Sequence, residues 1–296
     1  MMGSQIVNYF AGVETTQEDV EKSFPTKTEV DAMQSFVLGQ LQANEAARLL
    51  TSRTANATTP FSMDSRMRTL WTFINQTAVA IPSAQPSIIQ LLSTIRNLGP
   101  LKVPKEGEGA DWGIDLDDGE AWGKLPHWAN DWADLINFYE SNFLKSPNDE
   151  KAIVEWVSTI SYSARLTATG DPELIGDWFF IRRCCPSVVR VLDIFPLGDP
   201  SKQTVEIPAA AQLFFHASKE LFGRSLESDH IESLSSQHVA GDKLWQGDLA
   251  KLSVERWKHW KNRWAVLGGS EVLSEGLRTV ATGALKAIEQ AEPSAG

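Results

Sequence analysis

The sequence predicts an all-α protein, an irregular antiparallel bundle of about ten amphipathic helices with no sheet. Apolar residues recur at helical spacing in window after window, with almost no strict alternation of the kind that strands show. Eleven of the 296 residues are tryptophans, and several are helically spaced, as in Trp257, Trp260 and Trp264. No repeat of about 34 or 40 residues is sustained, which disfavours a helical repeat array.

Three helices are expected before residue 99, at 28–50, 64–80 and 86–98. Thr28 and Asp31 fit a capping box at the start of the first. Pro86 suits the first turn of the third, and Gly99 followed by proline ends it. We expect these helices to stack antiparallel to one another.

Seven further helices follow from the same periodicity, at 127–145, 146–169, 172–185, 187–195, 208–222, 248–267 and 270–290. We expect an N-terminal segment, 1–27, and one all-helical domain, 28–296, with a subdomain hinge at 196–204. The two cysteines are adjacent, Cys184 and Cys185, and we interpret them as buried thiols at a helix end.

Residues 99–126 lack helical periodicity, are rich in glycine and carry an acidic run together with Trp112 and Trp122. A stretch this long without regular structure is uncommon inside a compact domain. We therefore expect a lid or a partner-docking loop there. The carboxylates from Asp115 to Glu120 fail the EF-hand spacing, so no metal site is expected.

The amino-acid composition narrows the classes of partner that the protein can bind. The net charge of −11 and the pI near 5.0 disfavour nucleic acid, whose binding depends on Lys and Arg. No apolar run reaches membrane-spanning length, and the N-terminus does not read as a signal peptide. We expect a cytoplasmic protein, with the nucleus as the alternative, whose partner is an apolar small molecule or another protein. Oligomeric state stays open.

No nucleotide-binding or nucleophile motif is found, so no cofactor is implied. His216 falls opposite the apolar stripe of its helix and is expected to be exposed. In helix 248–267 the basic residues, among them Arg256 and Lys258, are interpreted as stems flanking the buried tryptophan stripe.

Arg182 shares a helix face with apolar neighbours, which predicts a guanidinium in an apolar contact that needs a carboxylate partner. Glu140 and Glu155 are the candidate partners, and a structural ion pair is favoured over a site. If a pocket exists, tryptophans are expected to line it: Trp128, Trp132, Trp156, Trp178 and Trp260.

Short helical blocks across 70–290 resemble a fungal family of unknown function, domain of unknown function 3632. The blocks include Leu70-Trp71, Ala210-Ala-Gln-Leu-Phe214 and Arg256-Trp-Lys-His-Trp-Lys-Asn-Arg263. Membership implies an all-helical fold and a fungal source, and it transfers no catalytic residue.

Two functions remain open. The first is a binding or interaction protein, accessory or regulatory in fungal metabolism. The second is a cofactor-independent isomerase or cyclase of fungal secondary metabolism, whose tryptophan-lined pocket folds an apolar substrate while Arg182, Glu140 or Glu155 polarises one oxygen. A tryptophan-lined cavity would favour the second, and a solid core the first.

Overall fold

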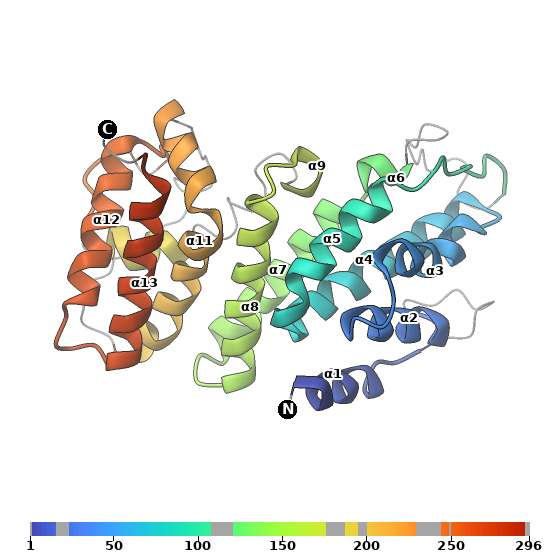
Figure 1. Cartoon of the computed structure of the whole chain (residues 1–296), viewed down its shortest axis with the longest axis horizontal. Coiled ribbons are helices and arrows are strands. Elements are labelled where there is room, and N and C mark those ends of the chain that lie inside the picture. Colours follow the sequence, from blue (N-terminus) through green and yellow to red (C-terminus); the bar gives the residue numbers. More distant parts are fainter. Residues whose placement is uncertain are drawn as a thin grey trace. The chain divides into compact units, whose positions relative to one another are not determined.

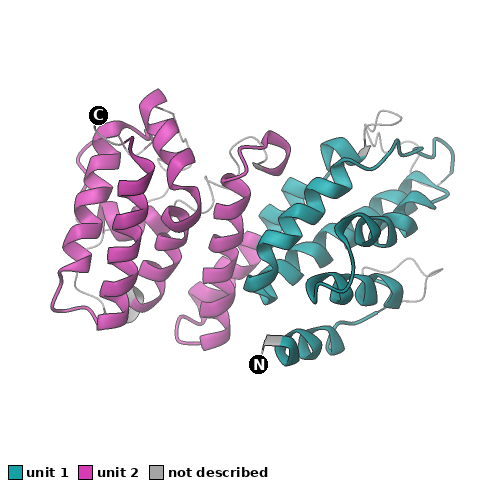
Figure 2. Ribbon diagram, in the orientation of Figure 1, with its two compact units in different colours: residues 1–135 teal, residues 136–296 magenta. Residues whose placement is uncertain are grey.

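The computed structural model describes residues 2–15, 24–107, 121–175, 187–194, 200–228, 244–248 and 250–293. Within these ranges the regular structure is helical, with twelve α-helices and no β-strand (Figure 1). The predicted all-α class is therefore confirmed. The described chain groups into two compact units, 1–135 and 136–296, and helix α7 (Trp128–Lys145) crosses their boundary (Figure 2). The expected single domain, 28–296, stays a prediction.

Unit 1 holds the helices up to the start of α7. In chain order they are α1 (Met2–Ala11), α2 (Lys27–Val37), α3 (Ala43–Ala55), α4 (Pro60–Ala80), the 3-10 turn η1 (Pro82–Ala84), α5 (Gln85–Arg96) and α6 (Ala121–Lys124). Helix α3 packs against α2, α4 and α5, and the core between them is fully buried at Met33, Leu50, Trp71 and Leu92. The predicted N-terminal segment contributes α1, which buries Ile6 and Phe10.

The single helix predicted at 28–50 is wrong, because the chain forms α2 and α3 with a turn between them. Gly39 has φ +73°, its N–H bonds to the carbonyl of Phe36, and the N–H of Gln40 bonds to that of Ser35. This pair of bonds is a Schellman motif, for which glycine is the preferred residue. The capping box also differs from Thr28 with Asp31: the Thr26 hydroxyl accepts from the N–H of Glu29, whose side chain accepts from the N–H of Thr26.

Unit 2 contains the rest of α7, followed by α8 (Glu150–Thr167), α9 (Pro172–Ile175), the π-helix η3 (Val189–Ile194), α11 (Pro200–Glu227), α12 (Val254–Gly268) and α13 (Glu275–Ala291). Helix α11 lies between α8 and α13, and α12 packs on α13 (Figure 1). Trp257, Trp260 and Trp264 are at most 1% exposed and surround the ring of Phe214, with centroid distances of 6.1, 5.8 and 5.6 Å. The inward tryptophan stripe is confirmed.

Helix α11 is longer than the predicted 208–222 because it continues through Pro208. Proline removes one backbone hydrogen bond, which is destabilising in isolation. Buried apolar residues before and after it, including Val205, Ile207 and Leu213, hold both halves in the core. Of the predicted hinge, residues 200–204 are helical and 196–199 lie outside the described residues.

Two other predicted helices differ. Only the first turn of 172–185 is described, as α9, and Cys184 and Cys185 lie outside the described residues. The segment predicted as a helix at 187–195 contains a π-helix, η3, rather than an α-helix.

The predicted loop, 99–126, is described only at 99–107 and 121–126. Trp122 is buried and packs edge-on against Trp71, with 6.4 Å between ring centroids. The Trp71 indole N–H donates to the carbonyl of Pro126 over 2.8 Å. Trp122 therefore belongs to the core of unit 1. Trp112 and most of the acidic run lie outside the described residues, so the lid or docking role stays a prediction.

No single helix of the described residues is long and apolar enough to cross a bilayer. Helix 60–80 and the helical segment 82–96 reach that length and apolar content only together, and they are bent by 113° relative to each other.

Candidate functional site

The π-helix η3 carries Arg190 and Asp193, and each organises a charged cluster in unit 2. A π-helical turn is rare, and such turns occur frequently at functional sites. Here η3 presents one cation and one carboxylate to helices of the same unit that are distant in sequence.

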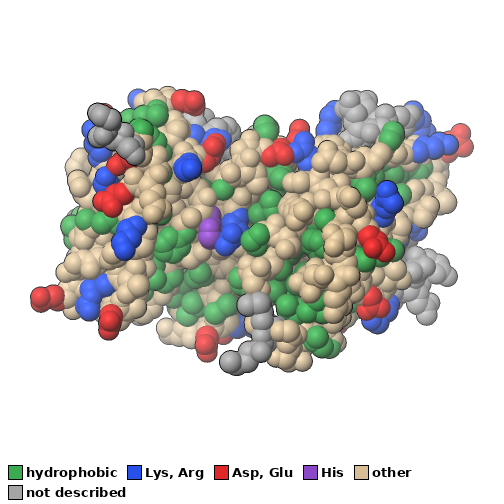
Figure 3. Space-filling view, viewed as in Figure 1, with side chains coloured by type: hydrophobic (Ala, Val, Ile, Leu, Met, Phe, Trp, Pro, Cys, Tyr) green, Lys and Arg blue, Asp and Glu red, His purple; other side chains and the backbone are tan. Residues whose placement is uncertain are grey.

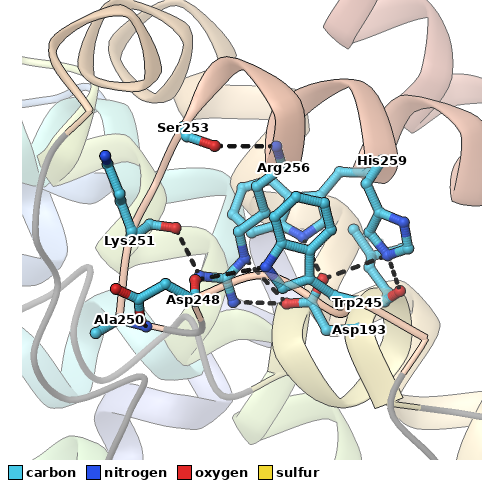
Figure 4. Close-up of polar contacts among 10 residues, drawn as sticks. Asp193, Trp245, Asp248, Ala250, Lys251, Ser253, Arg256 and His259 are labelled. Carbon is cyan, nitrogen blue, oxygen red and sulfur yellow. Dashed lines mark hydrogen bonds and ion pairs between the residues drawn. The ribbon is translucent and has the colours of Figure 1, made fainter.

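Asp193 and Arg256 form an ion pair whose side chains are both 0% exposed, with Nη2 and Oδ2 separated by 2.6 Å (Figure 4). The Nε of Arg256 donates to the same oxygen over 3.2 Å. The indole N–H of Trp260 donates to Oδ1 over 2.9 Å, and the Arg256 guanidinium lies 5.2 Å from the centroid of that ring. A carboxylate and a guanidinium are thus paired in a fully dry site.

The same aspartate connects three segments. Its backbone carbonyl accepts the N–H groups of Leu244 and Trp245 at 2.6 and 3.1 Å, while Nη1 of Arg256 donates to the carbonyl of Lys251. His259 donates from Nε2 to the carbonyl of Leu192 over 2.9 Å, which assigns the proton to that nitrogen. The cluster therefore ties η3, α12 and the 244–251 segment together.

The charges and hydrogen bonds of the Asp193–Arg256 cluster indicate a structural role. Burial raises the pKa of Asp193, and the nearby Arg256, Trp260 and His259 oppose that rise. Both carboxylate oxygens already receive donors, so neither is free for a ligand. Removing one partner would leave a buried charge without compensation, which is far more costly than the pair is stabilising.

Arg190 is shared by two glutamates. Its Nε lies 2.7 Å from Oε1 of Glu206, its Nη1 lies 3.4 Å from Oε1 of Glu140, and its Nη2 donates to the hydroxyl of Ser187. Burial is the largest cause that raises the pKa of Glu206, and the charge of Glu140 adds to it, while Arg190 opposes. Arg190 thus forms a structural ion pair with two carboxylates, whose combined negative charge exceeds the charge of the one guanidinium.

The candidate residues from the sequence are not brought together. Glu140 pairs with Arg190, and Glu155 lies 3.8 Å from Lys151 on the surface of α8. Arg182 and Trp178 lie outside the described residues. Trp128, Trp132, Trp156 and Trp260 are all fully buried, and Trp260 alone of them joins a cluster at η3. Whether the set forms one site stays a prediction.

Sequence reasoning missed Arg256, which it placed among the solvent-facing stems. That interpretation is wrong for Arg256, although Lys258 is exposed as expected. The signal was present, because Arg256 precedes Trp260 by one helical turn and therefore shares its inward face. Its partner Asp193 lies 63 positions earlier, and no local pattern links the two.

A third charged cluster lies in unit 1, between α4 and the start of α7. Arg68 donates to Asp64 Oδ2, Asp131 Oδ1 and His127 Nδ1 over 3.0, 2.9 and 2.9 Å. Because arginine can only donate, Nδ1 accepts, and Nε2 of His127 carries the proton toward Asp64 Oδ1 at 2.9 Å. His127 also has φ +65°, a conformation that costs a non-glycine residue about 1–3 kcal/mol.

The two aspartates of this cluster differ. Asp131 has a side chain 10% exposed, and its buried Oδ2 has no hydrogen-bond partner among the described residues. Burial raises the pKa of Asp131 to about 6 against the opposing charge of Arg68. The hydrogen bond from His127 lowers the pKa of Asp64.

The described residues of unit 2 also form a groove of about 360 Å³ between α11 and α13, open to solvent. Phe215, Lys219, Gln290 and Ala168 are among the residues that line it. Phe215 is 39% exposed, and its ring lies over Gly283, 3.1 Å from where a Cβ would stand. The close approach of α11 to α13 thus leaves an aromatic ring at the surface.

His216 also lines this groove. It is half-buried rather than exposed. Burial lowers its pKa to about 4, and the cation of Arg165 on α8 adds to that effect. On the face seen in Figure 3, a histidine (purple) lies beside a basic side chain (blue) among hydrophobic ones (green).

These features define an all-α protein with one fully buried ion pair, two partly exposed charged clusters and an open groove among its described residues. The family model described as protein of unknown function, DUF3632, matches residues 71–264, about two thirds of the chain. The chain belongs to this family. Neither a curated protein nor a solved structure matches it significantly.

Proposed function

We propose that this protein is a binding module whose ligand docks in the α11–α13 groove. The observation that carries the proposal is the contrast between the tryptophans and the groove. Trp128, Trp132, Trp156 and Trp260 are at most 1% exposed, so no water-sized space adjoins these rings, whereas Phe215 borders a groove of about 360 Å³. Ligand sites typically have volumes of roughly 300–1,000 Å³.

The enzyme alternative needs an enclosed aromatic cavity that can fold a substrate. The described tryptophans pack against protein instead: Trp156 stacks on Phe143 with 6.2 Å between centroids, and Trp260 contacts Phe214. This packing supports the binding module over the isomerase or cyclase. We infer that this acidic protein is cytoplasmic and has an accessory or regulatory role. Its ligand is then an apolar small molecule.

The test compares Phe215→Asp with Val266→Asp, an equally drastic change at an exposed position of α12. Both variants are titrated with a panel of apolar fragments of up to about ten carbons, and groove resonances are followed by NMR. We expect fragments to shift groove resonances in the native protein and in Val266→Asp, and to lose this effect in Phe215→Asp. The proposal fails if no fragment shifts the groove, or if Phe215→Asp responds like the native protein.

A further inference from the structure

Arg165 lies on α8 one turn before Ala168, a residue that lines the groove, and its guanidinium has no carboxylate partner among the described residues. No ion pair joins it to a carboxylate of the described residues, and its buried Nε has no acceptor among them. Burial lowers the pKa of Arg165, as expected for a cation whose surroundings do not favour the charged form. Its position in the last turn of α8 suits a cation.

Among the described residues that line the groove, the one carboxylate, Glu220, is already paired with a cation. His216 is neutral near pH 7, since its pKa is about 4. Lys219 is exposed at the groove wall, and Glu220 is already bound to Arg224 at 2.7 Å. The residues that line the groove are therefore apolar at Phe215, Ala168 and Ala287 and polar elsewhere, and the charge near Arg165 that no described carboxylate pairs with is positive.

We propose that the groove takes a small molecule with an apolar body and one carboxylate, the body on Phe215 and the carboxylate against Arg165 and His216. This inference rests on the proposed function and adds the charge of the ligand. A guanidinium presents a planar fork that matches a carboxylate, and hydrogen bonds between charged partners are about twice as strong as neutral ones. An anion there also supplies the countercharge that Arg165 lacks.

Protonation of His216 reports on the site. A bound carboxylate favours the charged imidazole and offsets the cation of Arg165, so the pKa of His216 rises on binding. His127 and His259 lie in other clusters and act as internal controls. The imidazole signal of His216 thus separates carboxylate binding beside Arg165 from binding elsewhere.

The experiment titrates the full chain with octanoate, 1-octanol and octylammonium, three probes that share one apolar body. We expect octanoate to bind most tightly, to shift groove resonances and to raise the pKa of His216 by at least about one unit. Arg165→Met should weaken octanoate about tenfold or more, without changing 1-octanol. Arg165→Lys should keep most of the affinity, and Lys258→Met, on the exposed face of α12, should change nothing.

The outcomes separate the two proposals. If no probe shifts the groove, the groove is not a binding site and both proposals fail. If 1-octanol binds as tightly as octanoate, or if Arg165→Met leaves the affinity for octanoate intact, the groove binds but carboxylate recognition by Arg165 is overturned. Octanoate binding with an unchanged pKa of His216 also overturns it. A folded Arg165→Met variant is confirmed by its native indole N–H spectrum.

Discussion

At the scale of single residues, two aspartates that bind the same arginine have pKa values shifted in opposite directions. Asp64 and Asp131 both bind Arg68, but Asp64 also accepts a hydrogen bond from His127, while the buried Oδ2 of Asp131 accepts none among the described residues. One pKa is lowered and the other is raised to about 6. Stability should therefore depend on pH with opposite signs at the two positions.

Asp131→Asn tests this sign. Because its pKa of about 6 in the folded protein exceeds the ordinary value near 4, Asp131 stabilises the fold most below about pH 4 and loses that contribution as the pH rises through 6. We expect Asp131→Asn to be at least as stable as the native protein at pH 7.5, with a weaker pH dependence between 4 and 6. Urea unfolding at several pH values measures both.

Asp64→Asn is the matched control. The lowered pKa of Asp64 means that its contribution is present above about pH 4 and is lost in more acidic solution. We expect Asp64→Asn to be less stable than the native protein at pH 7.5. Equal effects of the two asparagine variants would contradict the assigned hydrogen bonds.

Arg256→Met tests the dry ion pair. It leaves the carboxylate of Asp193 buried without its cation, so we expect a loss of about 3–5 kcal/mol in the free energy of unfolding. Adding Asp193→Asn should recover part of that loss, because the uncompensated charge is then gone. Lys258→Met should change stability by less than about 0.5 kcal/mol. Additive single effects would show that the two groups do not interact.

At the scale of elements, glycine separates α2 from α3. Gly39 adopts φ +73° with open space around it, so an added methyl group meets no neighbour and only the backbone is strained. We expect Gly39→Ala to destabilise unit 1 by about 1–2 kcal/mol. Gly276→Ala, in α13 with similar open space but an ordinary φ, should be neutral or stabilising. Thermal unfolding of both variants compares the two effects directly.

The long helices α4, α7, α8 and α13 were predictable because their apolar residues recur at helical spacing, although α4 and α8 are buried on more than one face. The failures have local physical causes. Helix 28–50 was joined across Gly39 because its apolar spacing persists through the turn, and α11 was cut short because a proline usually breaks a helix. In α11 tertiary burial outweighs that local penalty.

The charged clusters were predictable only in kind. A guanidinium in an apolar contact with a carboxylate partner was expected at Arg182, which lies outside the described residues; the structure shows such a contact at Arg256, which the sequence did not single out. Asp193 and Arg256 are 63 positions apart, and the π-helical turn that aims Asp193 has no periodic signature. The groove arises from the contact of α11 with α13, which a single helix pattern does not encode.

At the scale of the whole molecule, most of the described tryptophans pack in the core, and the binding site that we propose lies at the surface. Seven of them, at 71, 128, 132, 156, 257, 260 and 264, are among the largest fully buried side chains. Rings of this size dominate the burial of apolar surface. A ligand that enters the core would have to displace such rings, whereas the proposed ligand would occupy the open groove without repacking them.

The most direct measurement is an NMR titration of protein labelled with ¹⁵N at its tryptophan indoles and backbone amides, using octanoate and the apolar fragments. The account predicts shifts at backbone amides of 215–220 and 287–291, and unchanged indole signals for Trp128, Trp156 and Trp260. Large shifts of those indole signals with silent groove amides would mean that ligands enter a tryptophan-lined cavity, and would contradict the account.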